Sequence, residues 1–152
     1  MSGIYLIVTD NKYTDSKVLR PTTGGYPHIT VFHSGSHISA AHLKKLASKA
    51  LLMRFYTLTP ENAKINTFFH EKQKQQRFDV LLYLDQIGQD EIQSMRQYAY
   101  TTLDNSTLGK LSTSPPHVTH SIHWSEAEAQ AALEEVKKHL PIKIQTTGFT
   151  IK

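Results

Sequence analysis

The sequence of 152 residues predicts an α+β fold in which two β-α-β lobes are intertwined in one domain spanning 1–152. The first observation is that short β-branched and aromatic runs are interspersed with capped, amphipathic helical segments. The second is a tetrapeptide, proline-histidine-apolar-threonine, that occurs at 27–30 and again at 116–119. Each copy lies on an expected strand that is followed by a helix and another strand. This repetition indicates two lobes related by a pseudo-twofold axis.

The first half of the chain predicts two strands, a loop and a helix. Residues 4–9 form an apolar run that ends at a polar segment, and 10–25 is expected to be a loop rich in turn residues. Residues 27–33 read as the second strand. Ser36 or Ser39 can cap the helix that follows, because apolar residues then recur with helical spacing at Leu43, Leu46, Ala47, Ala50 and Leu51.

The middle of the chain predicts three strands and a second helix. The strands are expected at 54–59, 65–69 and 78–84, with the polar stretch 70–77 connecting the last two. After a turn at Gly88, helical spacing marks the second helix through Ile92, Met95, Ala99 and Leu103.

The last part of the chain repeats the order strand, helix, strand. A loop rich in Ser and Thr ends at Pro115, and a strand begins at His117. Ser125 with Glu128 forms a capping box for a third helix. That helix carries an apolar stripe and stops before Pro141, after which 142–151 alternates like a strand.

The composition excludes several classes of protein. With 39% hydrophobic and 20% charged residues, the chain is too apolar for a disordered protein. Without cysteine it has no disulfide, thiolate zinc site, iron–sulfur cluster or cysteine nucleophile. No early apolar run is long enough for a signal peptide or a membrane span, so we expect a soluble, cytoplasmic protein that does not bind membranes. The net charge of +4 modestly favours anionic ligands such as nucleotides or RNA.

The two tetrapeptides carry a specific chemical pattern. With nine histidines in the chain, about one His-x-Thr pair is expected by chance, so only the repetition is informative. Side chains alternate along a strand, so His28 and Thr30 share one face, as do His117 and Thr119. Two imidazoles across a cavity can remove a proton from an attacking oxygen and give one to the leaving oxygen of a phosphodiester. The threonine hydroxyls can bind the phosphate oxygens.

Two His-apolar-Thr motifs about ninety residues apart on strands of a duplicated α/β domain resemble the two-histidine (2H) phosphoesterase superfamily, which includes the cyclic phosphodiesterases. The resemblance implies a bilobed arrangement of antiparallel sheets around a central groove. It also implies phosphodiesterase activity, without metal or cofactor, on nucleotides or short RNA with 2′-5′ linkages or cyclic phosphates. His28 and His117 would be the catalytic pair, and Thr30 and Thr119 the phosphate-binding residues. Some viral members of the family degrade nucleotide messengers of antiviral signalling.

The second motif departs from the family pattern at one position. The family usually has an apolar residue after the threonine, as Val31 is here, whereas the second motif has His120. Position 120 is expected to point away from the groove. Further substrate contacts are predicted for five residues: Tyr13, Arg20, Phe32, Ser121 and Trp124.

Three other interpretations remain open from the sequence. The chain can be an RNA-binding or nucleotide-binding module that keeps the groove but not the chemistry. It can be an interaction domain in which the motifs match by coincidence, although no obligate protein partner is indicated. A histidine-rich metal site is the third, but His117 and His123 would be roughly 20 Å apart on an extended strand, too far for one ion.

Overall fold

The structure is a computed structural model, and it describes residues 2–9, 16–19, 27–34, 39, 41, 44, 54–102 and 114–151. All structural statements below concern these residues. The apolar residues that predicted the first helix, Leu43, Leu46, Ala47, Ala50 and Leu51, lie outside them.

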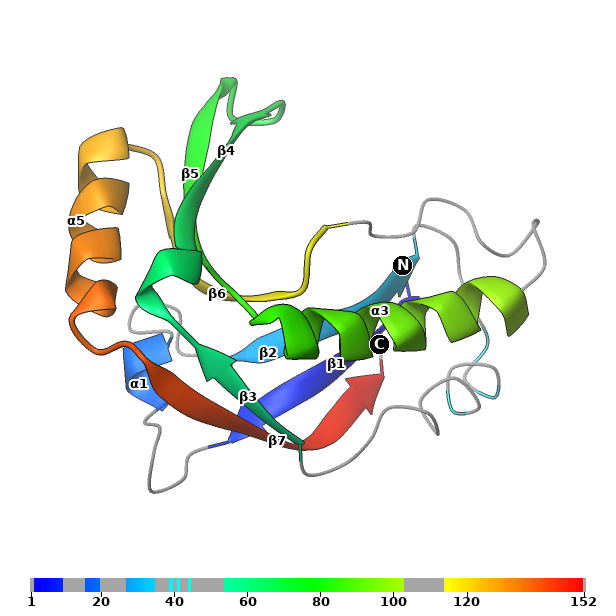
Figure 1. The fold of residues 1–152 in the computed structure, drawn as a ribbon. Coiled ribbons are helices and arrows are strands. Elements are labelled where there is room, and N and C mark those ends of the chain that lie inside the picture. The colour runs from blue at the N-terminus through cyan, green and yellow to red at the C-terminus, as the bar shows by residue number, and fades with distance from the viewer. Residues whose placement is uncertain are drawn as a thin grey trace.

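Seven strands form one curled sheet in the order β3-β7-β1-β2-β6-β5-β4, and all neighbouring pairs are antiparallel (Figure 1). The α+β class predicted from the sequence is therefore confirmed. The strands are β1 (Ser2–Thr9), β2 (His28–Ser34), β3 (Arg54–Leu58), β4 (Ala63–His70), β5 (Gln75–Tyr83), β6 (His117–His123) and β7 (Ile142–Ile151).

The two motif strands, β2 and β6, are neighbours at the middle of this sheet. Their register gives one residue pair, Ile29 with Val118, and both side chains are fully buried. From β2 the sheet continues through β1, β7 and β3, and from β6 it continues through β5 and β4. The hairpin of β4 and β5 stands away from the plane of the other strands (Figure 1). The pair at Ile29 and Val118 thus joins two differently oriented parts of the sheet.

Both motif strands have an extra residue directly after the threonine. Along β1, the partners on β2 change from Thr30 to Phe32, so Val31 has no partner of its own. Along β5, the partners on β6 change from Thr119 to Ser121, so His120 is the extra residue. Such a bulge increases the twist of a strand and shifts the alternation of its side chains beyond that point.

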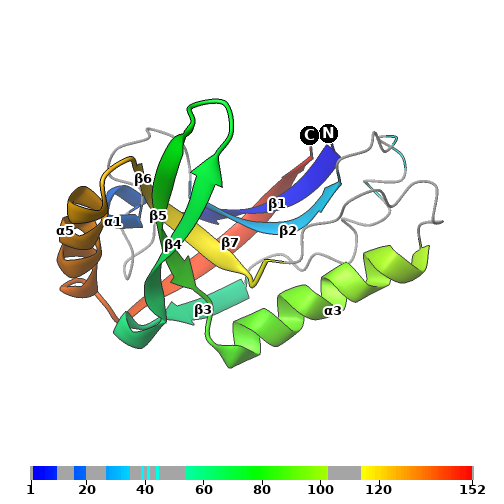
Figure 2. The ribbon, with the colours of Figure 1, turned by 90° about the horizontal axis from the view of Figure 1, so that it is seen from above.

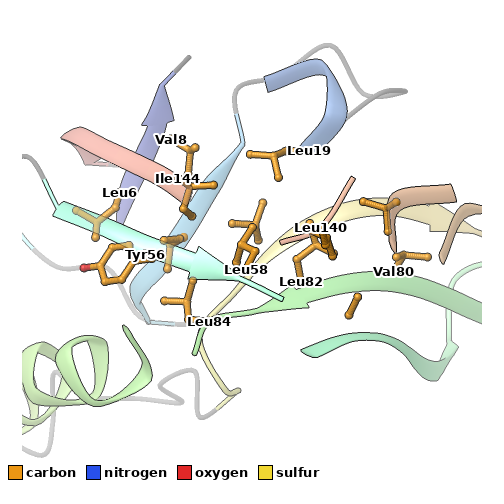
Figure 3. Close-up of a cluster of buried hydrophobic side chains, with 14 of the residues drawn as sticks. Leu6, Val8, Leu19, Tyr56, Leu58, Val80, Leu82, Leu84, Leu140 and Ile144 are labelled. Carbon is orange, nitrogen blue, oxygen red and sulfur yellow. The ribbon is translucent and has the colours of Figure 1, made fainter. Parts of the chain in front are cut away.

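Two longer helices and one short one flank the sheet. Helix α5 (Glu126–Lys137) packs against β4, β5 and β6, and α3 (Gln86–Thr102) packs against β2 and β3 (Figure 2). The Ser125 side chain accepts a hydrogen bond from the backbone N–H of Glu128, as predicted for the helix start. The core contains apolar side chains of both parts of the sheet and of α5, including Leu6, Val8, Leu58, Leu82 and Ile144 (Figure 3).

Several boundaries differ from the sequence predictions. Half of the polar stretch 70–77 belongs to strands, because β4 and β5 pair as far as His70 with Gln75 and leave a four-residue turn, in which Lys74 has a φ of 50°. Within the loop expected at 10–25, Ser16–Leu19 forms the short helix α1, whose Leu19 is fully buried. A 3₁₀ turn, η1 (Pro60–Asn62), connects β3 to β4. None of the described helices is long and apolar enough to cross a membrane.

Candidate functional site

The two motifs form one cluster across β2 and β6. Because these strands are antiparallel with Ile29 opposite Val118, His28 lies opposite Thr119 and Thr30 lies opposite His117. Ile29 and Val118 point into the core, so the other four side chains share the opposite face, where each is partly exposed. His28 and His117 are therefore diagonal neighbours across the two strands. Such neighbours are roughly 7–8 Å apart, which leaves space for a phosphate between the two imidazoles.

His117 is held in one orientation by the backbone. Its Nδ1 lies 2.7 Å from the carbonyl oxygen of Pro115. A carbonyl only accepts hydrogen bonds, so Nδ1 carries the proton and the lone pair of the neutral ring lies on Nε2. Burial lowers the pKa of His117, the hydrogen bond to Pro115 raises it, and the charge of Arg96 lowers it. The net pKa is below the ordinary 6.5, so the ring is neutral and able to accept a proton at neutral pH.

Each motif histidine contacts a tyrosine ring from the neighbouring strand. Tyr5 on β1 meets His28 edge-on with ring centres 5.4 Å apart, and Tyr83 on β5 meets His117 at 5.7 Å. Burial raises the pKa of both phenols, so both keep their protons at neutral pH. The tyrosines therefore limit the space around the imidazoles without adding a negative charge beside the proposed phosphate position.

A cavity of about 310 Å³ opens beside His117 and Thr119. On its β5 side, Arg77 donates two hydrogen bonds to Asp79, at 2.9 and 2.8 Å. A cavity of this volume can hold a small organic group. Its lining residues are Asn66, Arg77, Asp79, Leu81, Tyr83, Ser114, Pro115, His117 and Thr119.

Arg96 on α3 connects the two motif segments. Its guanidinium group is buried and donates hydrogen bonds to the carbonyl oxygens of Thr30 at 3.0 Å, Val31 at 2.8 Å and Ser114 at 2.6 Å. Pro115 and Pro116 have no N–H groups, so this part of the chain cannot donate backbone hydrogen bonds to β2. Arg96 supplies the donors instead and fixes the start of β6 relative to the first motif.

The other predicted contact residues are not all at this site. Ser121 is buried, and its hydroxyl lies 2.9 Å from Nδ1 of His120 and 2.8 Å from Nε2 of His123. Ser121 pairs with the core residue Val80, so the extra residue at His120 moves Ser121 off the face of His117. This placement differs from the expectation that Ser121 lines the groove. His120 itself is buried, in line with its predicted direction away from the groove.

Trp124 lies just beyond β6, is 42% exposed and meets the ring of His70 edge-on with centres 5.4 Å apart. It is not among the residues that line the cavity. Phe32 is on β2 beyond the extra residue Val31, and its side chain lies outside the described part of the structure. Tyr13 and Arg20 lie outside it entirely.

Sequence reasoning missed Arg96, the Arg77–Asp79 pair and the two tyrosines. A signal existed for Arg96, because it follows Ile92 by four residues and thus occupies a position on the apolar face of its helix. Asp79 likewise interrupts an otherwise apolar strand. A charged residue at an apolar position of a pattern indicates a buried partner.

Models of known protein families give no match to this chain, and curated proteins give none either. Within the described residues, no group of three or more histidine and acidic side chains is arranged to hold a metal ion. The four-residue cluster, the cavity beside it and Arg96 behind it are therefore the observations on which a functional proposal rests.

We expect Arg96→Met to lower the free energy of unfolding by about 3 kcal/mol or more, because three carbonyl groups lose their donors together. Arg96→Lys should be intermediate, since one ammonium group cannot replace the planar fork. Urea unfolding monitored by circular dichroism measures the change. Gln97→Ala, on the exposed side of the same helix, is the control and should stay within about 0.5 kcal/mol of the parent. A loss in Arg96→Met no larger than that of the control would contradict the role of Arg96.

His120 predicts a loss of stability in mild acid. Burial, with the nearby His123, lowers the pKa of His120 to about 4, whereas the unfolded ring has a pKa near 6.5. As the pH falls below 6.5, the unfolded chain binds a proton at His120 that the folded protein does not bind. The contribution of His120 to the free energy of unfolding is therefore full above pH 6.5 and is lost towards pH 4. At pH 5 the loss is about 2 kcal/mol relative to pH 7.5.

Urea unfolding at both pH values tests this dependence. His120→Asn should reduce the difference between pH 7.5 and pH 5 by about 2 kcal/mol, whatever its effect at neutral pH. The exposed His139 provides the matched control, and His139→Ala should keep the difference of the parent. An unchanged difference in His120→Asn would refute the buried neutral state of His120.

Proposed function

We propose that this chain is a metal-independent phosphodiesterase of the two-histidine type that acts on a nucleotide or oligonucleotide. The observation that supports it most strongly is the pairing of Ile29 with Val118, which brings both His-apolar-Thr motifs to one partly exposed face. Substrates with 2′-5′ linkages or cyclic phosphates are favoured, since the resemblance of the motifs implies them. The proposed reaction requires no cofactor, and we expect it to occur in the cytoplasm.

The geometry at His117 favours the role of general base for His117 and that of general acid for His28. Nε2 of His117 carries the lone pair, so His117 accepts the proton of the attacking water as its oxygen bonds to phosphorus. His28 donates a proton to the leaving ribose oxygen as the phosphorus–oxygen bond breaks. Thr30 and Thr119 donate hydrogen bonds to the non-bridging oxygens, where negative charge increases in the transition state.

We further propose that the fold consists of two duplicated, pseudo-twofold lobes in one domain over 1–152. Matching backbone details around the motifs support this. The carbonyl of Pro27 accepts a hydrogen bond from the N–H of Val8, and that of Pro116 accepts one from Leu84. In both strands the residue after the threonine is the extra one. At residues 27 and 116 the backbone carbonyl accepts this hydrogen bond and the N–H takes no part in it, so proline is tolerated at both positions.

A narrower form of the proposal is that the substrate is a nucleotide second messenger of antiviral signalling. A panel of linear 3′-5′, linear 2′-5′, cyclic mononucleotide and cyclic oligonucleotide substrates tests it. Cleavage restricted to messenger-type cyclic or 2′-5′ members would support this form, and indifference to all of them would exclude it.

We predict that His28→Ala and His117→Ala each reduce kcat at least about 100-fold on the best substrate of that panel, because each removes a proton-transfer group. Thr30→Val and Thr119→Val should reduce kcat about tenfold or more while keeping the side-chain shape. Activity should persist in excess chelator. Because the pKa of His117 is below 6.5, kcat/KM should stay constant down to pH 6.5 and fall only at lower pH, where His117 becomes protonated.

His139→Ala is the control, since this exposed histidine lies beyond the C-terminal end of α5, and it should retain full activity. Thermal unfolding of each variant must match the parent so that loss of activity is not loss of fold. Loss of activity in excess chelator would contradict the proposal, and so would activity in both His28→Ala and His117→Ala. Salt-dependent RNA binding without any cleavage would instead support a non-catalytic RNA-binding module on the same fold.

A further inference from the structure

An exposed surface rich in aromatic residues continues from the cavity along the β4–β5 hairpin. We call it the aromatic wall, and it consists of Phe68 and His70 on β4, Arg77 on β5, and Ile122 and Trp124 at the end of β6. The side chains of Phe68, Ile122 and Trp124 are 36%, 40% and 42% exposed. Large apolar side chains grouped on one exposed surface are a sign of a binding site.

The strand register places these side chains on the face of the sheet that carries the cavity. Phe68 lies opposite Arg77, and Ile122 lies opposite Asp79, and both Arg77 and Asp79 line the cavity. His70 is two residues beyond Phe68 and therefore points the same way. Trp124 joins this face through its ring contact with His70. The aromatic wall is thus a continuation of the cavity and not a separate patch.

Arg77 is fixed against the phenylalanine ring. Its guanidinium carbon lies 4.2 Å from the centre of the Phe68 ring, while Asp79 holds the same group by two hydrogen bonds. A planar guanidinium group stacked on an aromatic ring is a rigid platform for another flat group. Helix α5 packs on the β4–β5 hairpin from the opposite side, and none of the described helices covers the face with the aromatic wall (Figures 1 and 2).

The charge of the hairpin matches a polyanion. Residues 63–83 contain Lys64, Lys72, Lys74 and Arg77 against Glu71 and Asp79. Lys64 is exposed and lies opposite Leu81, a cavity residue, so it is on the same face as the wall. Stacking surfaces interleaved with cations are the pattern by which proteins bind single-stranded nucleic acid.

From these observations we infer that the aromatic wall binds bases of a single-stranded oligonucleotide that continues beyond the phosphate held by the two motifs. One base stacks on the Phe68–Arg77 platform, and the next stacks on Trp124. The inference rests on the proposed function for the position of that phosphate, and it names the substrate as an oligonucleotide and not a mononucleotide.

Fluorescence of Trp124 tests the inference directly, because it is the only tryptophan of the chain. The titration uses full-length protein carrying His117→Ala, which prevents turnover, and two ligands: tetraadenylate and an abasic tetranucleotide with the same phosphates. Tetraadenylate should quench the emission saturably and bind about tenfold or more tighter than the abasic ligand, since stacking contributes only where bases are present.

Phe68→Ala should weaken tetraadenylate binding about tenfold and leave binding of the abasic ligand unchanged. Phe55→Ala is the matched control: Phe55 is 50% exposed and its ring lies 5.5 Å from Nζ of Lys143, but it is on β3, at the other edge of the sheet. This variant should bind both ligands as the parent does.

Unchanged Trp124 emission on addition of tetraadenylate, or equal effects of Phe68→Ala and Phe55→Ala, would overturn the inference. The binding measurement is independent of cleavage. Base-dependent binding by a protein that cleaves nothing would support the wall and contradict the proposed function. Cleavage with no preference for bases beyond the scissile phosphate would support the proposed function and contradict the binding of bases by the aromatic wall.

Discussion

The contact between β2 and β6 at Ile29 and Val118 determines where every element of the site lies. It is one residue pair wide, yet it joins the two parts of the sheet and places the two motifs side by side. The prolines that precede His117 cannot extend this ladder, because they have no N–H groups. Arg96 extends it with side-chain donors to Thr30, Val31 and Ser114. A buried guanidinium group is tolerated here because three carbonyl oxygens replace its water.

Because side chains alternate along β2 and β6, one face of these strands packs in the core and the other carries the polar side chains of the motifs. Ile29 and Val118 bury their side chains in the core, and the neighbouring histidines and threonines face the other side. Val31 and His120 follow the same alternation and are both buried, and the extra residue at each of these positions changes the alternation beyond it. Each motif thus presents a histidine and a threonine to the face opposite the core, and those of the second motif, His117 and Thr119, line the cavity. Burial and the nearby charge of Arg96 lower the pKa of His117 and favour its neutral state, and they outweigh the hydrogen bond to Pro115, which raises that pKa.

Local patterns predicted much of the fold and the motif pairs, since strand alternation and the Ser125 cap depend on neighbouring residues. They also indicated that His28 and Thr30 share a face. The position of Ser121 was not predictable in this way, because a single extra residue at His120 reverses the alternation and depends on pairing with β5. Arg96, Tyr5 and Tyr83 act through contacts between segments far apart in sequence. Periodicity within one segment can indicate that Arg96 is buried, but it does not identify the segments that these residues contact.

The central claim is that His28 and His117 bind one phosphate between them, and nuclear magnetic resonance of ¹⁵N-labelled histidine tests it most directly. Titration with a nucleoside 2′-monophosphate reports each imidazole separately. The account predicts that the His28 and His117 signals shift together, with one dissociation constant, while exposed His139 does not respond. Shifts at only one of the two histidines, or different dissociation constants for the two, would contradict it.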